Sequence, residues 1–189
     1  AQYQPELVFH LAAQPIVREA YRRPQYTYET NVMGTVNICE CVRCNPCVRS
    51  FLNVTTDKVY ENQEWEWGYR ETDTLDGYDP YSNSKSCSEL VTHSYIRSFY
   101  REQNVAVSTA RAGNVIGGGD FAEDRIIPDC IRAARSGKEI LVRNPDSTRP
   151  YQHVLEPLYE YLKIAEAQYL DGSKAGAYNV GPEETDCIT

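Results

Sequence analysis

Val48 to Val54 (VRSFLNV) and Val105 to Ala110 (VAVSTA) decide the fold, because each is a short, largely apolar run. Short apolar runs bounded by polar residues are typical of buried strands. Between them lies Ser82 to Gln103, a long segment with few helix-breaking residues, and this segment predicts a helix. A strand, a helix and a second strand in this order predict neighbouring parallel strands with the helix covering one face of the sheet.

The same alternation extends along the chain in both directions. The further strands that we expect are Pro5 to Leu11, Glu139 to Val142 and Ala177 to Val180, and the further helices are Tyr26 to Val42, Pro128 to Ser136 and Val154 to Tyr169. The polar, acidic segment Gly68 to Tyr78 predicts a loop. With right-handed crossovers, the alternation builds a doubly wound parallel sheet, which is an α/β fold.

The expected sheet lacks the element with which doubly wound dinucleotide-binding folds begin. Those folds open with a strand, a G-x-G-x-x-G turn and a helix, and no such stretch precedes Pro5. The glycine run Gly117-Gly118-Gly119 follows the strand at Val105 to Ala110 and does not match that motif. We therefore interpret the chain as an internal piece of a longer one that lacks the first Gly-rich βαβ unit.

Charge and hydropathy exclude several classes of partner. The 189 residues carry a formal net charge of -8, and general nucleic-acid binding needs an excess of Lys and Arg. No apolar run approaches the roughly 20 residues of a membrane helix, and no signal-peptide pattern opens the chain. We therefore expect a cytoplasmic protein whose partners are neither nucleic acid nor membrane.

Four of the seven cysteines are crowded together, at Cys39, Cys41, Cys44 and Cys47. A zinc site needs four ligands that converge on one point. The segment Asn31 to Arg43 has the pattern of a helix, in which Cys39 and Cys41 would point to opposite faces at about 100° per residue. The spacing therefore favours structural or incidental cysteines over a metal module, and we assign no metal site.

The central chemical motif is Tyr81-Ser82-Asn83-Ser84-Lys85, in which a tyrosine and a lysine stand four residues apart. On a helix these two side chains share a face. A free phenol has a pKa near about 10, and a neighbouring ammonium lowers it by stabilising the phenolate. Tyr81 could then accept a proton from a sugar hydroxyl. The alternative is an exposed aromatic residue beside a charge.

The segment Thr55-Thr56-Asp57-Lys58 directly follows the strand at Val48 to Val54. In open parallel sheets, ligands bind at the carboxyl ends of the strands, so hydroxyls, a carboxylate and an amine are expected at that edge. The alternative is a polar turn capped by Thr and Asp.

In their order, these motifs resemble the extended short-chain dehydrogenases that act on nucleotide sugars, the NAD-dependent epimerase/dehydratase family. The matching stretches are His10-Leu11-Ala12-Ala13, Asn31 to Thr35, Thr55-Thr56-Asp57, Tyr81-x-x-x-Lys85 and Arg149 to Val154. Within the family, the stretches similar to the dehydratases acting on CDP-glucose are Thr56 to Asn62, Trp65 to Glu71, Gly77 to Ser82 and Arg111 to Asp120. Lys58 also follows that group, whereas the relatives acting on dTDP-glucose usually carry Glu there.

The resemblance implies a Rossmann-like dehydratase that uses recycled NAD to oxidise a sugar at C4, eliminate water across C5 and C6, and reduce C6. Tyr81 would remove the 4-hydroxyl proton, Thr56 would bind that hydroxyl, and Lys85 would tune Tyr81 and hold the nicotinamide ribose. Asp57 would protonate the departing 6-hydroxyl, which needs a pKa raised above about 3.9 by burial. Lys58 would be either a neutral base at C5 or a cation that stabilises the enolate, and both roles stay open.

Two further sets of contacts follow from the resemblance. Beside Tyr81 and Lys85, the implied cofactor contacts are Ala12, Ala13, Gln14, Asn31 and Thr55. The implied contacts to the nucleotide sugar are Asn114, Arg125, Arg149 and His153, because Arg pairs well with phosphate. The alternatives are small packing residues at Ala12 and Ala13, a surface salt bridge at Arg149 and a helix-start charge pair at Arg125.

The resemblance also divides the chain and suggests an assembly. Residues 1–116 would form the C-terminal part of the NAD-binding Rossmann domain with the catalytic residues. Residues 117–189 would carry mainly the substrate-binding segments of a smaller domain, interleaved with the first. A homodimer or homotetramer would pair through the helices at Asn31 to Arg43 and Ser82 to Gln103, although core packing explains the apolar side of the second helix equally well.

Three rival hypotheses stay open at this stage. A 4-epimerase or decarboxylase of the same fold would share Tyr81 and Lys85, but it needs no acid/base pair such as Asp57 and Lys58. A non-catalytic fragment would lack the pyrophosphate site and would not bind NAD. A cysteine-based metal module rests on Cys39 to Cys47 alone and is the weakest of the three.

Overall fold

Four parallel strands form the central sheet of the computed structural model, which describes residues 3–183, 186 and 187. Their order is β1-β2-β3-β6, with bounds Leu7–His10, Ser50–Val54, Ala106–Ala112 and Ala177–Val180. Leu7 pairs with Ser50, Ser50 with Ala106, and Thr109 with Ala177. These strands confirm four of the five predicted from the sequence, namely those at Pro5 to Leu11, Val48 to Val54, Val105 to Ala110 and Ala177 to Val180. The parallel α/β fold is confirmed as well.

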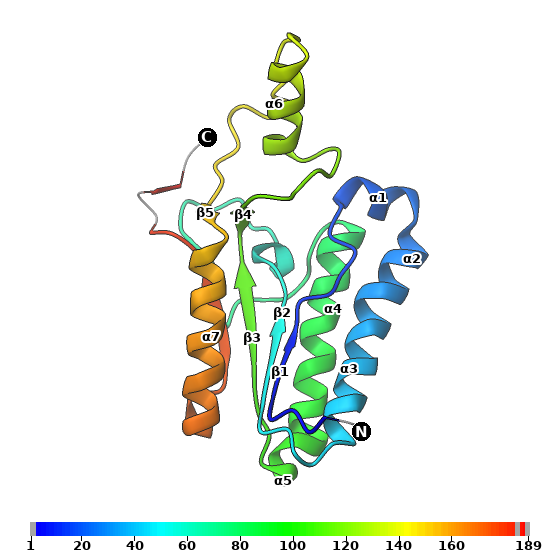
Figure 1. Cartoon of the computed structure of the whole chain (residues 1–189), viewed down its shortest axis with the longest axis vertical. Coiled ribbons are helices and arrows are strands. Elements are labelled where there is room, and N and C mark those ends of the chain that lie inside the picture. The colour runs from blue at the N-terminus through cyan, green and yellow to red at the C-terminus, as the bar shows by residue number, and fades with distance from the viewer. Residues whose placement is uncertain (1–2, 184–185, 188–189) are drawn as a thin grey trace.

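Helices cover both faces of the sheet (Figure 1). The helices are α1 (Val17–Arg22), α2 (Pro24–Tyr28), α3 (Gly34–Arg43), α4 (Pro80–Tyr95), α5 (Arg101–Gln103), α6 (Ile126–Arg135) and α7 (Leu155–Leu170). In Figure 1, α3 and α4 lie on one side of the strands and α7 lies on the other. The strands run upward in that view, so their carboxyl ends meet at one edge, below α6.

Strand β2 shows why the sheet is covered on both faces. Successive side chains of a strand point to opposite faces. Phe51 packs with Cys39, Val107 and Tyr100 on the face covered by α3 and α4. Its neighbour Leu52 belongs to the second apolar cluster, on the face covered by α7. A continuous apolar run, instead of alternation, is therefore the sequence signature of this strand.

The two long helical segments predicted from the sequence are confirmed, with local changes. The first runs through α2, a π-helical turn at Glu29–Met33 and α3. The second runs through α4, a π-helical turn at Ile96–Tyr100 and α5, and Asn104 ends it in the left-handed conformation that asparagine tolerates.

The prediction of a strand at Glu139 to Val142 is wrong. That segment is irregular, and the side chains of Ile140, Leu141 and Val142 are exposed. Three apolar residues in a row resemble a buried strand, but in the part of the chain that the structure describes no neighbouring strand pairs with them. A two-stranded sheet forms instead between β4 (Asn114–Ile116) and β5 (Tyr151–His153), and these strands are too short to show periodicity.

The cysteines diverge as the helix prediction requires. Cys39 is buried in the core, and Cys41 and Cys44 are exposed. Among the described residues, no group of three or more His, Cys, Asp or Glu side chains is placed to hold a metal ion. Within the same residues, no helix combines the length and the apolarity that a membrane crossing demands.

Candidate active site

Residues from β2 and α4 meet at the carboxyl edge of the central sheet, where ligands bind in such folds. Strand β2 ends at Val54, and Thr56 then begins the 3₁₀ turn Asp57–Val59. The backbone N–H of Lys58 donates to the Thr56 hydroxyl at 3.5 Å. This turn directs the Thr56 and Asp57 side chains toward the first turn of α4.

The start of α4 is fixed by local sequence, which places Tyr81 reproducibly. Asp79 caps the helix by accepting from the backbone N–H groups of Tyr81 at 2.9 Å and Ser82 at 3.1 Å, and Pro80 occupies the first helical position. Gly77 lies flat against this turn, since a Cβ added there would stand 2.4 Å from the carbonyl carbon of Ser82. A side chain at position 77 would therefore push α4 away from its loop.

Tyr81, Thr56 and Asp57 form one electrostatic group. The Thr56 hydroxyl donates to the Asp57 carboxylate, with Oγ1 and Oδ1 2.9 Å apart. Burial raises the pKa of Tyr81 to about 12, and the influence of the Thr56 hydroxyl acts in the opposite direction. Burial also raises the pKa of Asp57, against the lowering effect of Lys58 and Arg149. A carboxyl group with a raised pKa is what an acid at this position needs.

Lys85 lies one turn beyond Tyr81 and is buried, with 4% of its surface exposed. Its ammonium donates to the carbonyl of Val54 at 3.0 Å. Burial lowers the pKa of Lys85 to about 8, opposed by the nearby charge of Glu89. Burial also lowers the pKa of His10 to about 4, with the charge of Lys85 as the second cause. Burial therefore disfavours the charged form of both side chains, and His10 is neutral near pH 7.

Asn31 holds in place the segment after β1, where three of the predicted cofactor contacts lie. Its side chain accepts from the backbone N–H of Gln14 at 2.8 Å and donates to the Gln14 carbonyl at 3.1 Å. It also donates to the Ser84 hydroxyl at 2.9 Å. Asn31 thus ties the segment after β1, which contains Ala12 and Ala13, to α4, and its side-chain amide is already hydrogen-bonded within the protein.

Sequence reasoning missed a buried ion pair beneath this group. Arg111 on β3 donates to both carboxylate oxygens of Glu89 at 2.9 Å each, and both side chains are almost fully buried. The Thr55 hydroxyl donates to Glu89 at 2.5 Å, and Arg111 also donates to the Tyr60 hydroxyl at 2.7 Å. Its sequence signal was a Glu one turn beyond Lys85 on the same helix face.

The four predicted substrate contacts fall into different surroundings. The charge of Arg125 lowers the pKa of Tyr81, and the charge of Arg149 lowers the pKa of Asp57, so both arginines influence the group at the carboxyl edge of the sheet. Arg125 also pairs with Asp120 at 3.0 Å. It does not form the helix-start pair with its sequence neighbour Asp124, which pairs with Arg18 and Arg143 instead. Asn114 begins β4, opposite Tyr151.

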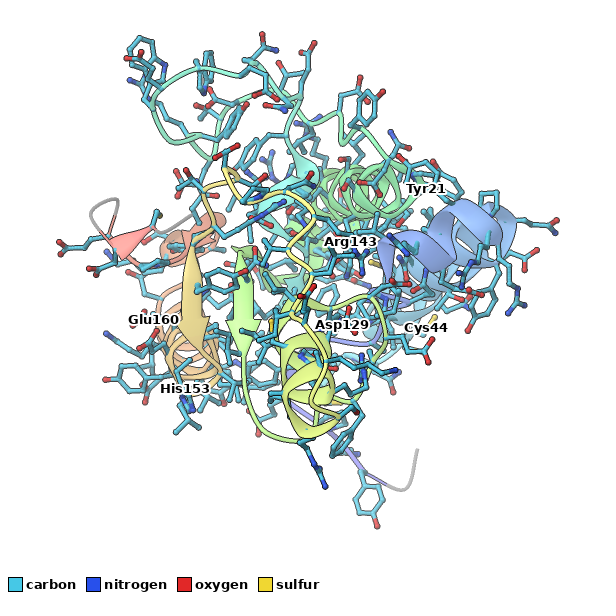
Figure 2. All side chains as sticks on the ribbon, turned by 90° about the horizontal axis from the view of Figure 1, so that it is seen from above. Tyr21, Cys44, Asp129, Arg143, His153 and Glu160 are labelled. Carbon is cyan, nitrogen blue, oxygen red and sulfur yellow. The ribbon has the colours of Figure 1, made fainter. Side chains whose placement is uncertain are left out.

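His153 lies apart from the catalytic edge. It is exposed, and its Nδ1 accepts from the backbone N–H of Leu155 at 3.3 Å. It lines a cavity of about 740 Å³ together with Glu160, Tyr178 and Asp186, and none of the proposed catalytic residues lines that cavity. In Figure 2, which looks down on the molecule from above, His153 and Glu160 lie beside α7, apart from Arg143 and Asp129. Its role in substrate binding stays a prediction.

The residues present fit one half of a dinucleotide. Lys85 uses one of its three N–H donors on Val54 in the described structure, which leaves donors for a ribose. Small side chains at Ala12 and Ala13 follow β1 at the same edge and leave room for a ring. Gly117 does not serve as an open phosphate cradle, because a Cβ there would stand 2.8 Å from Val154. The pyrophosphate-binding turn of such folds is not among these residues.

A parallel sheet covered on both faces, with a Tyr-x-x-x-Lys helix against a Thr-Asp turn, defines a Rossmann-like protein of the epimerase/dehydratase class. The chain belongs to the family described as GDP-mannose 4,6 dehydratase, whose model matches residues 1–181.

Relatives and solved structures agree with this assignment. The chain is 49% identical over 195 residues to CDP-glucose 4,6-dehydratase of Salmonella typhimurium, covering 100% of this chain and 54% of that protein. It is similar to a mutant UDP-glucuronic acid 4-epimerase of Bacillus cereus, solved with UDP-4-deoxy-4-fluoro-glucuronic acid and NAD. The TM-score is 0.81 at 21% identity, over 95% of this chain and 55% of that one.

A double mutant of the dTDP-glucose 4,6-dehydratase DesIV from Streptomyces venezuelae, solved with NAD and DAU bound, gives TM-score 0.78 at 22% identity, over 93% of this chain and 51% of that one. The chain spans about half the length of the relatives that it matches. At these identities the solved structures establish the fold, and they extend no function to this chain.

Proposed function

We propose that these residues form the catalytic part of a nucleotide-sugar 4,6-dehydratase that converts CDP-glucose to CDP-4-dehydro-6-deoxyglucose and water. The observation that carries the proposal is the hydrogen-bonded group of Thr56 and Asp57 facing Tyr81, with Lys85 one turn further along α4. The 49% identity to a CDP-glucose 4,6-dehydratase supports the choice of nucleotide.

NAD, when bound, would accept a hydride from C4 of the sugar and return it to C6 within one turnover. Ala12, Ala13 and Gln14 would line the nicotinamide end of its site, and Lys85 would donate to the ribose. Asn31 would act by holding Gln14 through both of its backbone groups. Thr55 would act on the cofactor site indirectly, because its hydroxyl donates to Glu89.

Tyr81 would remove the proton of the 4-hydroxyl while Thr56 orients that hydroxyl. In this structure burial holds the pKa of Tyr81 at about 12, so the phenolate needs nearby positive charge. Lys85 would supply it from the next turn of α4. Arg125 adds to it, because its charge lowers the pKa of Tyr81.

Asp57 would protonate the 6-hydroxyl as it leaves. An ordinary aspartate is ionised at neutral pH and cannot donate. Burial raises the pKa of Asp57, so this carboxyl can hold a proton that a solvated one would lose. Lys58, next in sequence, would act on C5 either as a neutral base or as a cation that stabilises the enolate.

The remaining assignments concern the parts around the catalytic edge. Arg149 and Arg125 would bind the diphosphate, and Asn114 and His153 would contact other parts of the nucleotide sugar.

Residues 1–116 would belong to the cofactor domain and residues 117–189 mainly to the substrate-binding part. We further propose a cytoplasmic homodimer or homotetramer that pairs through the helices at Asn31 to Arg43 and Ser82 to Gln103.

Incubating the full-length protein with CDP-glucose and NAD tests the function. A 4-keto-6-deoxy sugar absorbs strongly in alkali, whereas a 4-epimer does not, so the assay separates the dehydratase from an epimerase. We expect Asp57→Asn to slow product formation by about 100-fold or more, because it removes the acid. Asp171→Asn, at an exposed 3₁₀ turn, is the control. A wild-type protein that returns only an epimer would refute the proposed function.

A further inference from the structure

Lys85 is a buried cation whose charge the proposed reaction needs, and this inference rests on that proposed function. Only 4% of the residue is exposed, and its ammonium donates to the carbonyl of Val54 at 3.0 Å. A carbonyl oxygen is a neutral acceptor, and an ammonium buried without an opposite charge tends to lose its proton. A neutral Lys85 would no longer stabilise the Tyr81 phenolate, so another group has to hold this charge in place.

Glu89 lies one helical turn beyond Lys85 on the buried side of α4. The Thr55 hydroxyl donates to its carboxylate at 2.5 Å, and Thr55 directly follows Val54, the acceptor of Lys85. Two side chains four residues apart on α4 thus bind consecutive residues at the end of β2. This arrangement brings the carboxylate and the ammonium to the same part of the carboxyl edge of the sheet.

The Glu89 carboxylate is ionised and held in one orientation. Arg111 of β3 donates to both of its oxygens at 2.9 Å each, and Nη1 of Arg111 also donates to the Tyr60 hydroxyl and the Glu71 carbonyl. Burial raises the pKa of Glu89, but the hydrogen bonds and the charge of Arg111 outweigh burial, so the pKa lies below its usual value. Glu89 therefore keeps its negative charge at neutral pH.

We propose that Glu89 is a positioning residue of the dehydratase, whose fixed carboxylate keeps the Lys85 ammonium charged and seated at the end of β2, one turn from Tyr81. Burial lowers the pKa of Lys85 to about 8, and the charge of Glu89 opposes this effect. Without the negative charge of Glu89, the pKa of Lys85 would fall further, because only burial would then act on it. Lys85 would lose its proton at a lower pH, and the phenolate would lose its support at the same pH.

Other groups around Lys85 do not replace this carboxylate. His10 of β1 is neutral near pH 7, because burial lowers its pKa to about 4. Asp57, in the turn after β2, has to be protonated to act as the proposed acid. Asn31 and Thr35, which bind α4 from the first helical segment, carry no charge. The remaining titratable groups at this end of α4 and on the adjoining elements are neutral or cationic at neutral pH, namely Lys58, Tyr81, His93 and Arg111.

Glu89→Gln/Arg111→Met in the full-length protein tests the proposal, because this double variant removes the negative charge without leaving a buried arginine unpaired. ¹³C NMR of the lysine ε-carbons, assigned with Lys85→Met, follows the Lys85 proton in the absence of NAD and substrate. We expect the pKa of Lys85 to fall by about 1 in the double variant. The alkaline limb of kcat/KM for CDP-glucose should move to lower pH by the same amount. Glu40→Gln/Arg43→Met, which removes an exposed pair, is the control and should move neither.

A Lys85 titration that is the same in the double variant and the wild type would overturn the proposal, and so would a shifted titration with an unmoved alkaline limb. A purely structural role of Glu89 would lower the rate equally at every pH. Should the double variant fail to fold, Glu89→Gln alone takes its place, since Arg111 then keeps its acceptors at Tyr60 and Glu71, and the same two measurements decide. A wild-type protein that forms no 4-keto product refutes the proposed function, whereas the NMR titration still shows whether Glu89 holds the charge of Lys85.

Discussion

Helices α4 and α7 are each 16 residues long and pack on opposite faces of the same sheet, yet they are buried in opposite ways. Every buried residue of α4 is polar: Ser82, Ser84, Lys85, Ser86, Ser88, Glu89 and Thr92. The buried residues of α7 are mainly apolar: Pro157, Tyr161, Ile164, Ala165 and Gln168. The buried side of α4 therefore makes mainly hydrogen bonds, whereas the buried side of α7 makes mainly apolar contacts.

The difference follows from what each helix carries. Short hydroxyl side chains let α4 approach the neighbouring elements closely, and each finds a partner: Ser86 donates to the carbonyl of Val59, and Thr35 pairs with Ser88. Directional bonds of this kind fix both the rotation and the height of a helix. We infer that α4 is held this way because it carries Tyr81, whereas α7 needs only to cover the sheet.

The largest effect on this comparison is expected at Arg111, a residue that is 2% exposed and pairs with Glu89 of α4. We expect Arg111→Met to lower the free energy of unfolding by about 4 kcal/mol, because it leaves the Glu89 carboxylate buried and unpaired. Urea unfolding of the variant and the wild type measures the difference. The control is Arg43→Met in the exposed Arg43–Glu40 pair, expected to cost less than about 1 kcal/mol.

The double variant Arg111→Met/Glu89→Gln identifies the cause of that loss. Neutralising the orphaned carboxylate should restore a large part of the stability, because the cost lies in the unpaired charge. If the double variant is as unstable as Arg111→Met, then lost packing, and not the charge, explains the effect.

A smaller effect is expected from His10, on the α4 side of the sheet. Its pKa is about 4 in the folded protein and 6.5 when unperturbed. As pH falls below about 6.5, His10 becomes protonated in the unfolded chain, whereas in the folded protein it stays neutral until about pH 4. The free energy of unfolding should therefore decrease by roughly 3 kcal/mol across this window, and this cost is absent above it.

Urea unfolding at several pH values between 4 and 7 measures this slope. His10→Asn should flatten it, leaving a remainder from His93, whose pKa burial also lowers. His153→Gln, an exposed position, should leave the slope unchanged. A His10→Asn variant with the wild-type slope would show that this ring is already solvated.

The contrast between α4 and α7 also shows which parts of the fold could be predicted from the amino-acid sequence. The strands and α7 could be predicted from apolar runs, because an apolar residue type itself indicates a buried position. The helix at Ser82 to Gln103 was predicted from its lack of breakers, but its polar buried face looks like a solvated one. Arg111 and Glu89 were missed for the same reason, since partners separated by 22 residues meet only once the sheet has formed.

At the candidate site, sequence supplied the residue types and structure supplied their partners. Tyr81 and Lys85 could be placed on one face by helical spacing alone. The Asn31 side-chain amide is hydrogen-bonded to Gln14 and Ser84. These partners are far apart in sequence, so residue spacing could not predict them. The strand predicted at Glu139 to Val142 failed for a related reason, because a strand also requires a neighbour.

The smallest expected effect sharpens the comparison from the α7 side. Ile164 packs with Leu52 and Ala110 and is 8% exposed, so Ile164→Ala should lower the free energy of unfolding by about 2 kcal/mol, the low end for a residue near the surface. Leu162→Ala on the same helix, 61% exposed, should change it by less than about 0.5 kcal/mol. Because α7 carries no proposed catalytic group, Ile164→Ala should leave the rate per folded molecule unchanged at temperatures below unfolding. A fall in that rate would mean that apolar packing on this face also sets the position of Tyr81, and that the two faces are coupled through the sheet.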